Sequence, residues 1–190
     1  MDYGKSEWLD DIKRQTKRLT MLTNDLVLLS RMEEAENNLQ MLLLPFSDLV
    51  NETAASFAAL IQTQNKVFRC AIEPRISLTG DEKSIRRLIN ILMDNALKYS
   101  PSQGLISLSV KKQGKQVCLT VCNTTQNPIS KDELHMMFER FYRIDSSRNA
   151  QTGGFGIGLS VAKAIVTAHR TPRTIIYLLL LSFNPNGLSW

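Results

Sequence analysis

Residues 85–100 read IRRLINILMDNALKYS, and their spacing predicts an amphipathic helix. Its apolar residues recur three and four apart, so they share one stripe: Ile85, Leu88, Ile89, Leu92, Ala96 and Tyr99. At about 100° per residue, Ile91, Asn95 and Lys98 fall together on one shoulder of that stripe. An amide oxygen can ligate a hard cation, and an ammonium group can meet a phosphate. By itself the stretch is better explained as a surface helix with two ordinary polar residues. The rest of the chain must therefore decide whether these residues bind a ligand.

The composition is typical of a soluble globular protein, and its basic net charge would suit an anionic ligand. The chain has 190 residues, of which 43% are hydrophobic and 22% charged, enough for one domain with an appendage. A net charge of +5 is too mild to indicate nucleic acid, and no basic stripe with interleaved aromatic residues supports it. We therefore expect no nucleic-acid partner.

Three cysteines, Cys70, Cys118 and Cys122, offer neither an even disulfide framework nor a metal site. On a predicted strand, Cys118 and Cys122 are separated by about 13 Å, which is too far for a disulfide. No cluster of cysteine and histidine accompanies them, so structural zinc is not expected. Reduced core thiols in a cytoplasmic protein are the simplest account. No signal peptide opens the chain, and the apolar run 175–181 is too short to span a bilayer.

Residues 6–34 predict a long helix with a heptad seam. The seam residues alternate four and three apart: Trp8, Ile12, Gln15, Leu19, Leu22, Leu26 and Leu29. A single helix cannot bury such a seam, so we expect an intermolecular bundle or a truncated one, with a homodimer formed through this helix. The alternative, a helix on the surface of its own domain, stays open.

The remaining pattern alternates strands and helices, which predicts a two-layer α/β sandwich with helices over one face of a mixed sheet. Ser47 or Asp48 is expected to cap the first helix of this sandwich, and Asp81 the helix that carries residues 85–100. The expected elements are, in order, a strand near 39–44, a helix to about 64, strands 66–72 and 75–78, the helix 85–100, a hairpin of 105–110 and 116–121, a short helix ending in FERFYR, and a helix to about 169.

Residues 153–159, GGFGIGL, form a second signal, because glycines that lead into a helix let backbone amides approach a phosphate. A dinucleotide-binding fold would need a strand directly before them and an acidic residue about twenty residues later, and neither is present. A phosphate-binding loop of the Walker type would need Lys after Gly158, where Leu159 stands.

Three motifs in order resemble the N, F and G2 boxes of bacterial sensor histidine kinases: DNALKYSP at 94–101, FERFYR at 138–143 and GGFGIGL. These kinases belong to the GHKL (HATPase) superfamily of ATP-binding domains; gyrase shares the fold but not an FERFYR-type box. The resemblance implies three parts: residues 1–38, similar to the second helix of a dimerisation hairpin; residues 39–169, the ATP-binding catalytic domain; and residues 170–190, an atypical apolar tail.

The resemblance also implies a site for ATP and Mg²⁺. Asn95 would ligate the metal, Lys98 would contact a phosphate, and Tyr99 would flank the nucleotide. Tyr99 could equally be an ordinary core residue.

The lid and the glycine loop would complete this site. Phe138, Phe141 and Tyr142 would anchor the lid, with Arg143 directed toward the phosphates, although the phenylalanines could also be plain core. The remaining implied nucleotide contacts are Gly154, Gly156, Gly158 and Leu159.

Four departures from the family pattern stand out. Asn123 takes the place of the G1-box aspartate that recognises adenine, and Ile91 stands where many relatives have a second asparagine. The phosphoacceptor is absent, because His135 and His169 lie outside its context and are expected to be surface or helix-end residues. The ending TPRTIIYLLLLSFNPNGLSW is expected to supply at most one buried strand.

We therefore expect the ATP-binding catalytic domain of a two-component sensor histidine kinase, which transfers the γ-phosphoryl group to a histidine outside this chain. A response regulator would be its partner, and any membrane attachment would come from other segments. The alternative is a non-catalytic dimerisation or interaction module with a degenerate nucleotide site. A GHKL ATPase acting on another substrate is disfavoured by FERFYR.

Overall fold

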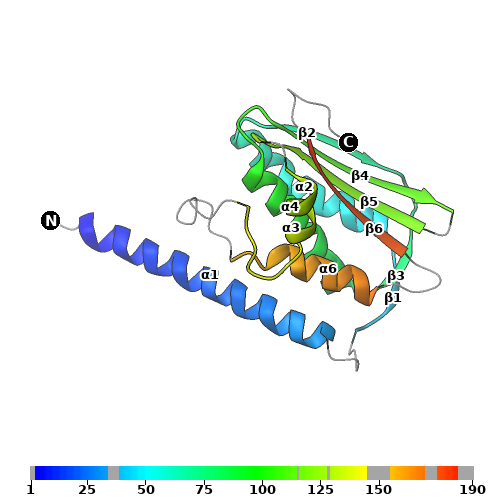
Figure 1. The fold of residues 1–190 in the computed structure, drawn as a ribbon, viewed down its shortest axis with the longest axis horizontal. Coiled ribbons are helices and arrows are strands. Elements are labelled where there is room, and N and C mark those ends of the chain that lie inside the picture. The colour runs from blue at the N-terminus through cyan, green and yellow to red at the C-terminus, as the bar shows by residue number, and fades with distance from the viewer. Residues whose placement is uncertain are drawn as a thin grey trace.

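The computed structural model describes residues 3–33, 39–114, 116–127, 129–144, 155–169 and 175–183. Helices lie over one face of a four-stranded mixed sheet, and one long helix extends away from this body (Figure 1). This arrangement confirms the predicted two-layer α/β sandwich. The elements are, in chain order, α1 (Tyr3–Glu33), β1 (Leu42–Leu44), α2 (Phe46–Thr63), β2 (Val67–Ile72), β3 (Leu78–Gly80), α3 (Glu82–Tyr99), β4 (Leu105–Gln113), β5 (Gln116–Thr124), α4 (Lys131–Met136), α6 (Gly158–Ala168) and β6 (Ile175–Phe183).

The main sheet has the order β2-β4-β5-β6, in which β4 and β5 form an antiparallel hairpin between two parallel neighbours. Side chains on β4 and β5 alternate between buried and half-buried, because successive residues of a strand point to opposite faces. The buried set packs under the helices and consists of Ile106, Leu108, Val110, Val117, Leu119 and Val121. The hairpin strands extend further than predicted, to Gln113 and Thr124.

Helix α3 forms because its apolar stripe is buried and its first turn is capped. Asp81 Oδ1 accepts a hydrogen bond from Ser84 N–H at 2.8 Å, which confirms the predicted cap. The stripe residues from Ile85 to Ala96 are fully buried, whereas Tyr99 is 45% exposed. Tyr99 is therefore a surface residue at the helix end, and the core alternative for it is wrong.

His169, at the end of α6, is hydrogen-bonded to the start of α3. Its ring is fully buried; Nε2 accepts a hydrogen bond from Asp81 N–H at 3.0 Å, and Nδ1 donates to the Ile165 carbonyl at 2.7 Å. The expected helix-end position is correct, but the expected surface position is wrong. The ring also explains Gly80, where an added Cβ would lie 3.0 Å from His169 Cδ2.

Helix α2 begins differently from the expectation. Neither Ser47 nor Asp48 caps it; its N-cap is Pro45, and no side chain bonds to its first amides. The Ser47 hydroxyl instead donates to the Glu73 carbonyl at 2.6 Å and accepts from Ile76 N–H at 3.0 Å. Ser47 therefore makes tertiary hydrogen bonds instead of capping its own helix. Spacing in the sequence does not reveal which of these two roles the hydroxyl takes.

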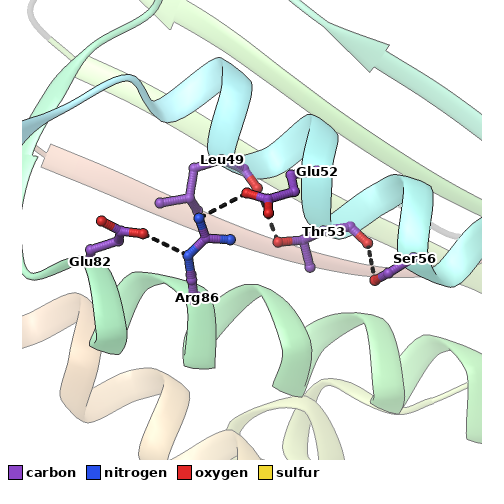
Figure 2. A network of polar contacts seen from close by, with 6 residues as sticks. All are labelled: Leu49, Glu52, Thr53, Ser56, Glu82 and Arg86. Atoms are coloured by element: carbon purple, nitrogen blue, oxygen red, sulfur yellow. Dashed lines mark hydrogen bonds and ion pairs between the residues drawn. The ribbon is translucent and has the colours of Figure 1, made fainter.

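Arg86 links α2 to α3 at the surface (Figure 2). Its guanidinium donates to Glu82 one turn earlier and to Glu52 on α2, both at 2.8 Å. The Glu82 and Glu52 side chains are 52% and 68% exposed. Ion pairs with such exposure contribute little to stability, so the buried apolar contacts hold α2 against α3.

One strand prediction and one prediction about cysteines need correction. The strand expected at 75–78 lies instead at Leu78–Gly80, where it pairs antiparallel with β1 in a separate small sheet. The thiols are not core residues: Cys70 is exposed, and Cys118 and Cys122 are half-buried on the sheet face away from Leu119 and Val121. All three are free thiols.

Among the described side chains of helix α1, those in its C-terminal part pack on the domain. Leu29 is buried there, Leu22 and Leu28 pack against the core, and Asp25 pairs with Arg87 of α3. The apolar seam toward the N-terminus is exposed, including Trp8 at 70%. The alternative of a helix on its own domain is therefore correct for the C-terminal part. Among the described helices, none has the length and apolarity that a membrane span requires.

The C-terminal tail does supply one strand, β6, and the burial of its side chains lies outside what the structure describes. It runs parallel to β5, from the pairing of Ile175 with Gln116 to that of Phe183 with Thr124. The remainder of residues 170–190 lies outside the described residues.

Replacing Asp81 with alanine should lower the free energy of unfolding at pH 7 by about 1–2 kcal/mol, because the first turn of α3 loses its cap. Burial alone would raise the Asp81 pKa, but hydrogen bonds from Ser84 and Gln40 lower it overall. The carboxylate's contribution should therefore be complete above about pH 4 and decline as the pH falls through the depressed folded-state pKa. Urea unfolding at several pH values measures both effects.

Asp48→Ala provides the control, because Asp48 is an exposed residue in the first turn of α2 that does not act as its cap. Its effect should stay within about 0.5 kcal/mol. Equal losses in the two variants would contradict the role assigned to Asp81.

Candidate functional site

The C-terminal half of α3 presents the predicted amide and ammonium groups together. Asn95 is half-buried and Lys98 is exposed, one turn apart at the edge of the buried stripe. Ile91, one turn before Asn95, is only 6% exposed. The predicted shoulder therefore exists, with an apolar first turn and a polar second turn.

Asp94 is an ionisable group at this site that the sequence analysis did not single out. Burial raises the pKa of its carboxyl group, while the charges of Lys98 and Arg87 act in the opposite direction. The carboxyl group is therefore partly desolvated, and it belongs to the residue that precedes Asn95 in the chain. Its signal in the sequence was weak, because an acidic residue on a helix is usually a solvated one.

The FERFYR segment and the glycine loop are in direct contact. Phe141 N–H donates to the Gly156 carbonyl at 2.9 Å. Gly156 has a φ of 72°, and an added Cβ would lie 2.8 Å from the Tyr142 carbonyl oxygen. Both the left-handed backbone and the close approach require glycine at this position. The two motifs therefore form one structural unit although fifteen residues separate Phe141 from Gly156.

Phe141 itself has a φ of 63°, an uncommon conformation for a bulky residue, and its side chain is 64% exposed. Phe138 is half-buried and packs against the core, as the anchoring role requires. Tyr142 and Arg143 follow in half-buried positions. The exposed side chain of Phe141 is inconsistent with the plain-core alternative, which suits Phe138 only.

The glycine loop enters α6 at Gly158, and this helix start is suited to an anion. No side chain caps it, since the N-cap is Ile157 and makes no side-chain hydrogen bond to the first turn. The amides of a helix's first turn have no partner within the helix and lie at the positive end of its dipole. A phosphate group can accept hydrogen bonds from such amides.

Packing brings this helix start against α3. An added Cβ at Gly158 would lie 3.4 Å from Ile91 Cγ2, and α3 and α6 pack against each other. Leu159 is 6% exposed, so its side chain belongs to the core and only its backbone can contribute to an anion site. Gly154 lies outside the described residues.

Asn123 lies at the end of β5, on which α3 packs. It is 7% exposed, and its Nδ2 donates to the Thr124 carbonyl at 3.0 Å. Two residues later, the Thr125 hydroxyl is buried without a hydrogen-bond partner among the described residues. Asn123 takes no part in the contact between Phe141 and Gly156 or in the contact between Gly158 and Ile91.

The link between Asp25 and Arg87 was also missed. Asp25 lies three residues after Leu22 and four before Leu29, so it interrupts the apolar seam with a charge. That interruption was the available signal, but its partner is 62 residues away in the chain.

Residues 80–178 match the family of histidine kinase-, DNA gyrase B- and HSP90-like ATPases. Among curated relatives, the chain is 33% identical over 165 residues to the sensor protein DltS of Streptococcus agalactiae, covering 87% of this chain and 41% of that protein. It is 30% identical to the signal transduction histidine-protein kinase BaeS of Escherichia coli, covering 86% of this chain and 35% of that protein. The chain thus spans about two fifths of the length of these relatives.

Solved structures share the fold. The histidine kinase AdeS of Acinetobacter baumannii superposes with a TM-score of 0.67 at 22% identity, over 84% of this chain and 72% of that one. Full-length ShkA in complex with AMPPNP gives a TM-score of 0.66 at 19% identity, over 86% of this chain and 34% of that one. These likenesses show the fold, and the family match over more than half of its residues shows that the chain belongs to the histidine kinase-, DNA gyrase B- and HSP90-like ATPases.

Proposed function

We propose that this chain is the ATP-binding catalytic part of a sensor histidine kinase and transfers the γ-phosphoryl group of ATP to a histidine on another segment. The observation that carries the proposal is the packing of the uncapped start of α6 against α3, one turn before Asn95. In this proposal the first-turn amides of α6, the Asn95 amide oxygen and the Lys98 ammonium group would act on one nucleotide. The curated relatives named as sensor kinases support the same assignment.

The residues suit a nucleotide triphosphate with Mg²⁺. Asn95 would hold the metal through its amide oxygen, since hard cations prefer oxygen ligands and Mg²⁺ commonly keeps phosphate oxygens and waters as further ligands. Within the described residues, no group of three or more His, Cys, Asp or Glu side chains offers an alternative cation site. When bound, the metal would neutralise phosphate charge.

Phosphate binding would involve Lys98 and the first-turn amides of α6, which supply positive charge without a rearrangement of the fold. Gly156 and Gly158 would let the backbone approach the phosphates, with Gly154 and the Leu159 amide beside them. Phosphoryl transfer needs mainly positioning and charge stabilisation, and these groups supply both. Arg143 would add a second cation from the FERFYR segment.

The base would be recognised by Asn123. Its Nδ2 is engaged with the Thr124 carbonyl, which leaves Oδ1 as the available acceptor for an exocyclic amino group such as that of adenine. An amide in this orientation would replace the carboxylate of the family motif in hydrogen bonding, though not in charge. Tyr99 and Tyr142 would flank the nucleotide.

The accepting histidine would lie outside this chain. His169 is fully buried with both ring nitrogens hydrogen-bonded, so neither is available as a nucleophile. His135 is exposed, but it lies in the last turn of α4, on the same segment as the FERFYR motif. Residues 1–38 would belong to a dimerisation hairpin, residues 39–169 to the catalytic domain, and residues 170–190 to an atypical tail.

A homodimer would form through α1, whose exposed apolar residues need a partner: Trp8, Ile12, Leu19 and Leu26. A response regulator would receive the phosphoryl group, and the catalytic part would work in the cytoplasm, with any membrane anchor on other segments.

ATP or AMPPNP should bind in a Mg²⁺-dependent manner, and Asn95→Ala should weaken binding about tenfold or more, because the metal loses its protein ligand. Isothermal titration calorimetry measures the affinity. Asn51→Ala, on the exposed face of α2, serves as the control and should bind like the parent chain. Absence of binding by the parent would refute the proposed function, and a dimer that binds no nucleotide would favour an interaction module.

Gly156→Ala should impair both folding and nucleotide binding, because its Cβ would collide with the Tyr142 carbonyl. We expect a loss of about 1–3 kcal/mol in the free energy of unfolding and weaker AMPPNP binding. Gly114→Ala separates the two causes, since Gly114 has a similar φ of 62° with nothing within 4 Å of the added Cβ. It should lose only about 1 kcal/mol and keep its nucleotide affinity; matching losses would show that backbone strain alone matters.

Incubation of this chain with γ-labelled ATP should yield no acid-labile phosphate on the protein. The reason is that His169 is inaccessible and His135 lies outside a phosphoacceptor context. Scintillation counting after acid and base treatment distinguishes phosphohistidine from phosphoesters. Robust acid-labile labelling, lost in His135→Gln, would place the acceptor within this chain and contradict the proposal.

A further inference from the structure

Two side-chain hydroxyl groups are buried without a hydrogen-bond partner within the described residues, those of Ser100 and Thr125. Buried polar groups are almost always paired, because an unpaired one has lost its contacts with water. The Ser100 hydroxyl is enclosed by the loop that follows α3, where a Cβ added at Gly104 would collide with its oxygen. The Thr125 hydroxyl has no such surrounding loop contact and needs another explanation.

Thr125 lies just beyond the end of β5, two residues after Asn123. Side chains alternate between the two faces of a strand, so residues two apart share a face at a distance of about 7 Å. Asn123 is on the buried face of β5, in line with Leu119 and Val121. One further step of the alternation places Thr125 on the same face. The residue as a whole is half-buried, whereas its hydroxyl oxygen is buried.

This end of β5 is close to the end of α3 through a short connection. Residues 100–104 separate α3 from Leu105, the first residue of β4. Leu105 N–H in turn donates a hydrogen bond to the Thr124 hydroxyl at 3.0 Å. Asn123 and Thr125 therefore lie at the end of the sheet that the chain reaches directly after the last turn of α3.

Asn123 and Thr125 offer complementary hydrogen-bonding groups. Asn123 Nδ2 donates to the Thr124 carbonyl at 3.0 Å, so the amide orientation is fixed and its free group, Oδ1, is an acceptor only. A threonine hydroxyl can donate one hydrogen bond. The two residues thus present an acceptor beside a donor. This pattern matches an amino group next to an unprotonated ring nitrogen, and it opposes a carbonyl group next to a ring N–H.

We propose that the Thr125 hydroxyl is a second base-recognition group, which donates a hydrogen bond to ring nitrogen N1 of adenine while Asn123 Oδ1 accepts from the 6-amino group. This edge of adenine is the one farthest from the ribose, which suits contact with buried groups. Guanine has a carbonyl and an N–H at the same edge, so its carbonyl oxygen would face Asn123 Oδ1. Thr125 therefore adds selectivity for a 6-aminopurine. Its role rests on the proposed function, because it requires a nucleotide at this site.

The unpaired state of the hydroxyl distinguishes this role from a structural one. In the free chain the buried hydroxyl forms no protein hydrogen bond and therefore contributes nothing to stability through one. A bound base with an acceptor at N1 would supply the missing partner. Loss of the hydroxyl should therefore weaken nucleotide binding without weakening the fold.

The primary test compares ligands on the full parent chain by calorimetry with Mg²⁺. In 1-deaza-ATP a CH group replaces N1, and in 7-deaza-ATP a CH group replaces N7. The parent should bind 1-deaza-ATP about tenfold more weakly than ATP, because the Thr125 hydroxyl loses its acceptor. It should bind 7-deaza-ATP and ATP equally. Equal affinities for ATP and 1-deaza-ATP, or a loss confined to 7-deaza-ATP, would overturn the contact with N1.

Variants then assign the discrimination to one residue. Thr125→Val removes the hydroxyl, so ATP affinity should fall about tenfold, and ATP and 1-deaza-ATP should bind equally. Thr125→Ser keeps a hydroxyl and should still prefer ATP. Thr120→Val, on the opposite face of β5, is the matched control and should behave like the parent. A Thr125→Val chain that still prefers ATP over 1-deaza-ATP would overturn the role of Thr125, since another group would then contact N1.

Thermal unfolding without nucleotide provides the second readout. The melting temperature of Thr125→Val should equal or exceed that of the parent, because the change removes an unpaired buried hydroxyl. A clearly lower melting temperature would show a structural role and overturn the proposal. A parent chain that binds ATP without distinguishing 1-deaza-ATP would refute the role of Thr125 alone. A parent chain that binds no nucleotide would refute the proposed function itself.

Discussion

Burial of one face of α3 is the constraint on which the other parts of the structure depend. The helix lies between the sheet and α6, so its inner stripe must be apolar while its edges remain free to carry polar groups. Its start is fixed by Asp81, and Asp81 is fixed in turn by the His169 ring. The position of Asn95 therefore follows from contacts that lie four turns away from it. A site built on such a helix gains precision from core packing rather than from its own polar contacts.

The local parts of this arrangement could be predicted from the sequence. The periodicity of residues 85–100, the cap at Asp81 and the hairpin each depend on neighbours within a few residues. The incorrect predictions concern residues whose partners lie far away in the chain. Ser47 bonds to Glu73 rather than to its own helix, and His169 bonds to Asp81 across 88 residues. The strand at Leu78–Gly80 was displaced by its pairing with β1, which spacing alone does not encode. A single sequence carries little information about such pairings.

The candidate site shows the same division between local motifs, which could be predicted, and non-local contacts, which could not. The glycine loop and the FERFYR segment could be recognised separately, but not that Phe141 N–H bonds to Gly156 or that Gly158 packs on Ile91. That packing gives Ile91 a positive role. An apolar residue at this position fills the space between α3 and the start of α6, where an amide would need a polar partner. Ile91 is therefore a packing residue between α3 and the start of α6.

The parallel pairing of β6 with β5 has a consequence for how the protein is made. Parallel neighbours need a long crossover, and here it contains α4 and α6. While a ribosome is still synthesising this crossover, the β5 edge has no strand to pair with and must stay protected from other chains. The last strand can pair only after the crossover with α4 and α6 has been synthesised, and long-range closure of this kind is intrinsically slow. Until β6 has been synthesised, the edge of β5 can pair with other chains, and this risk of aggregation follows from the topology.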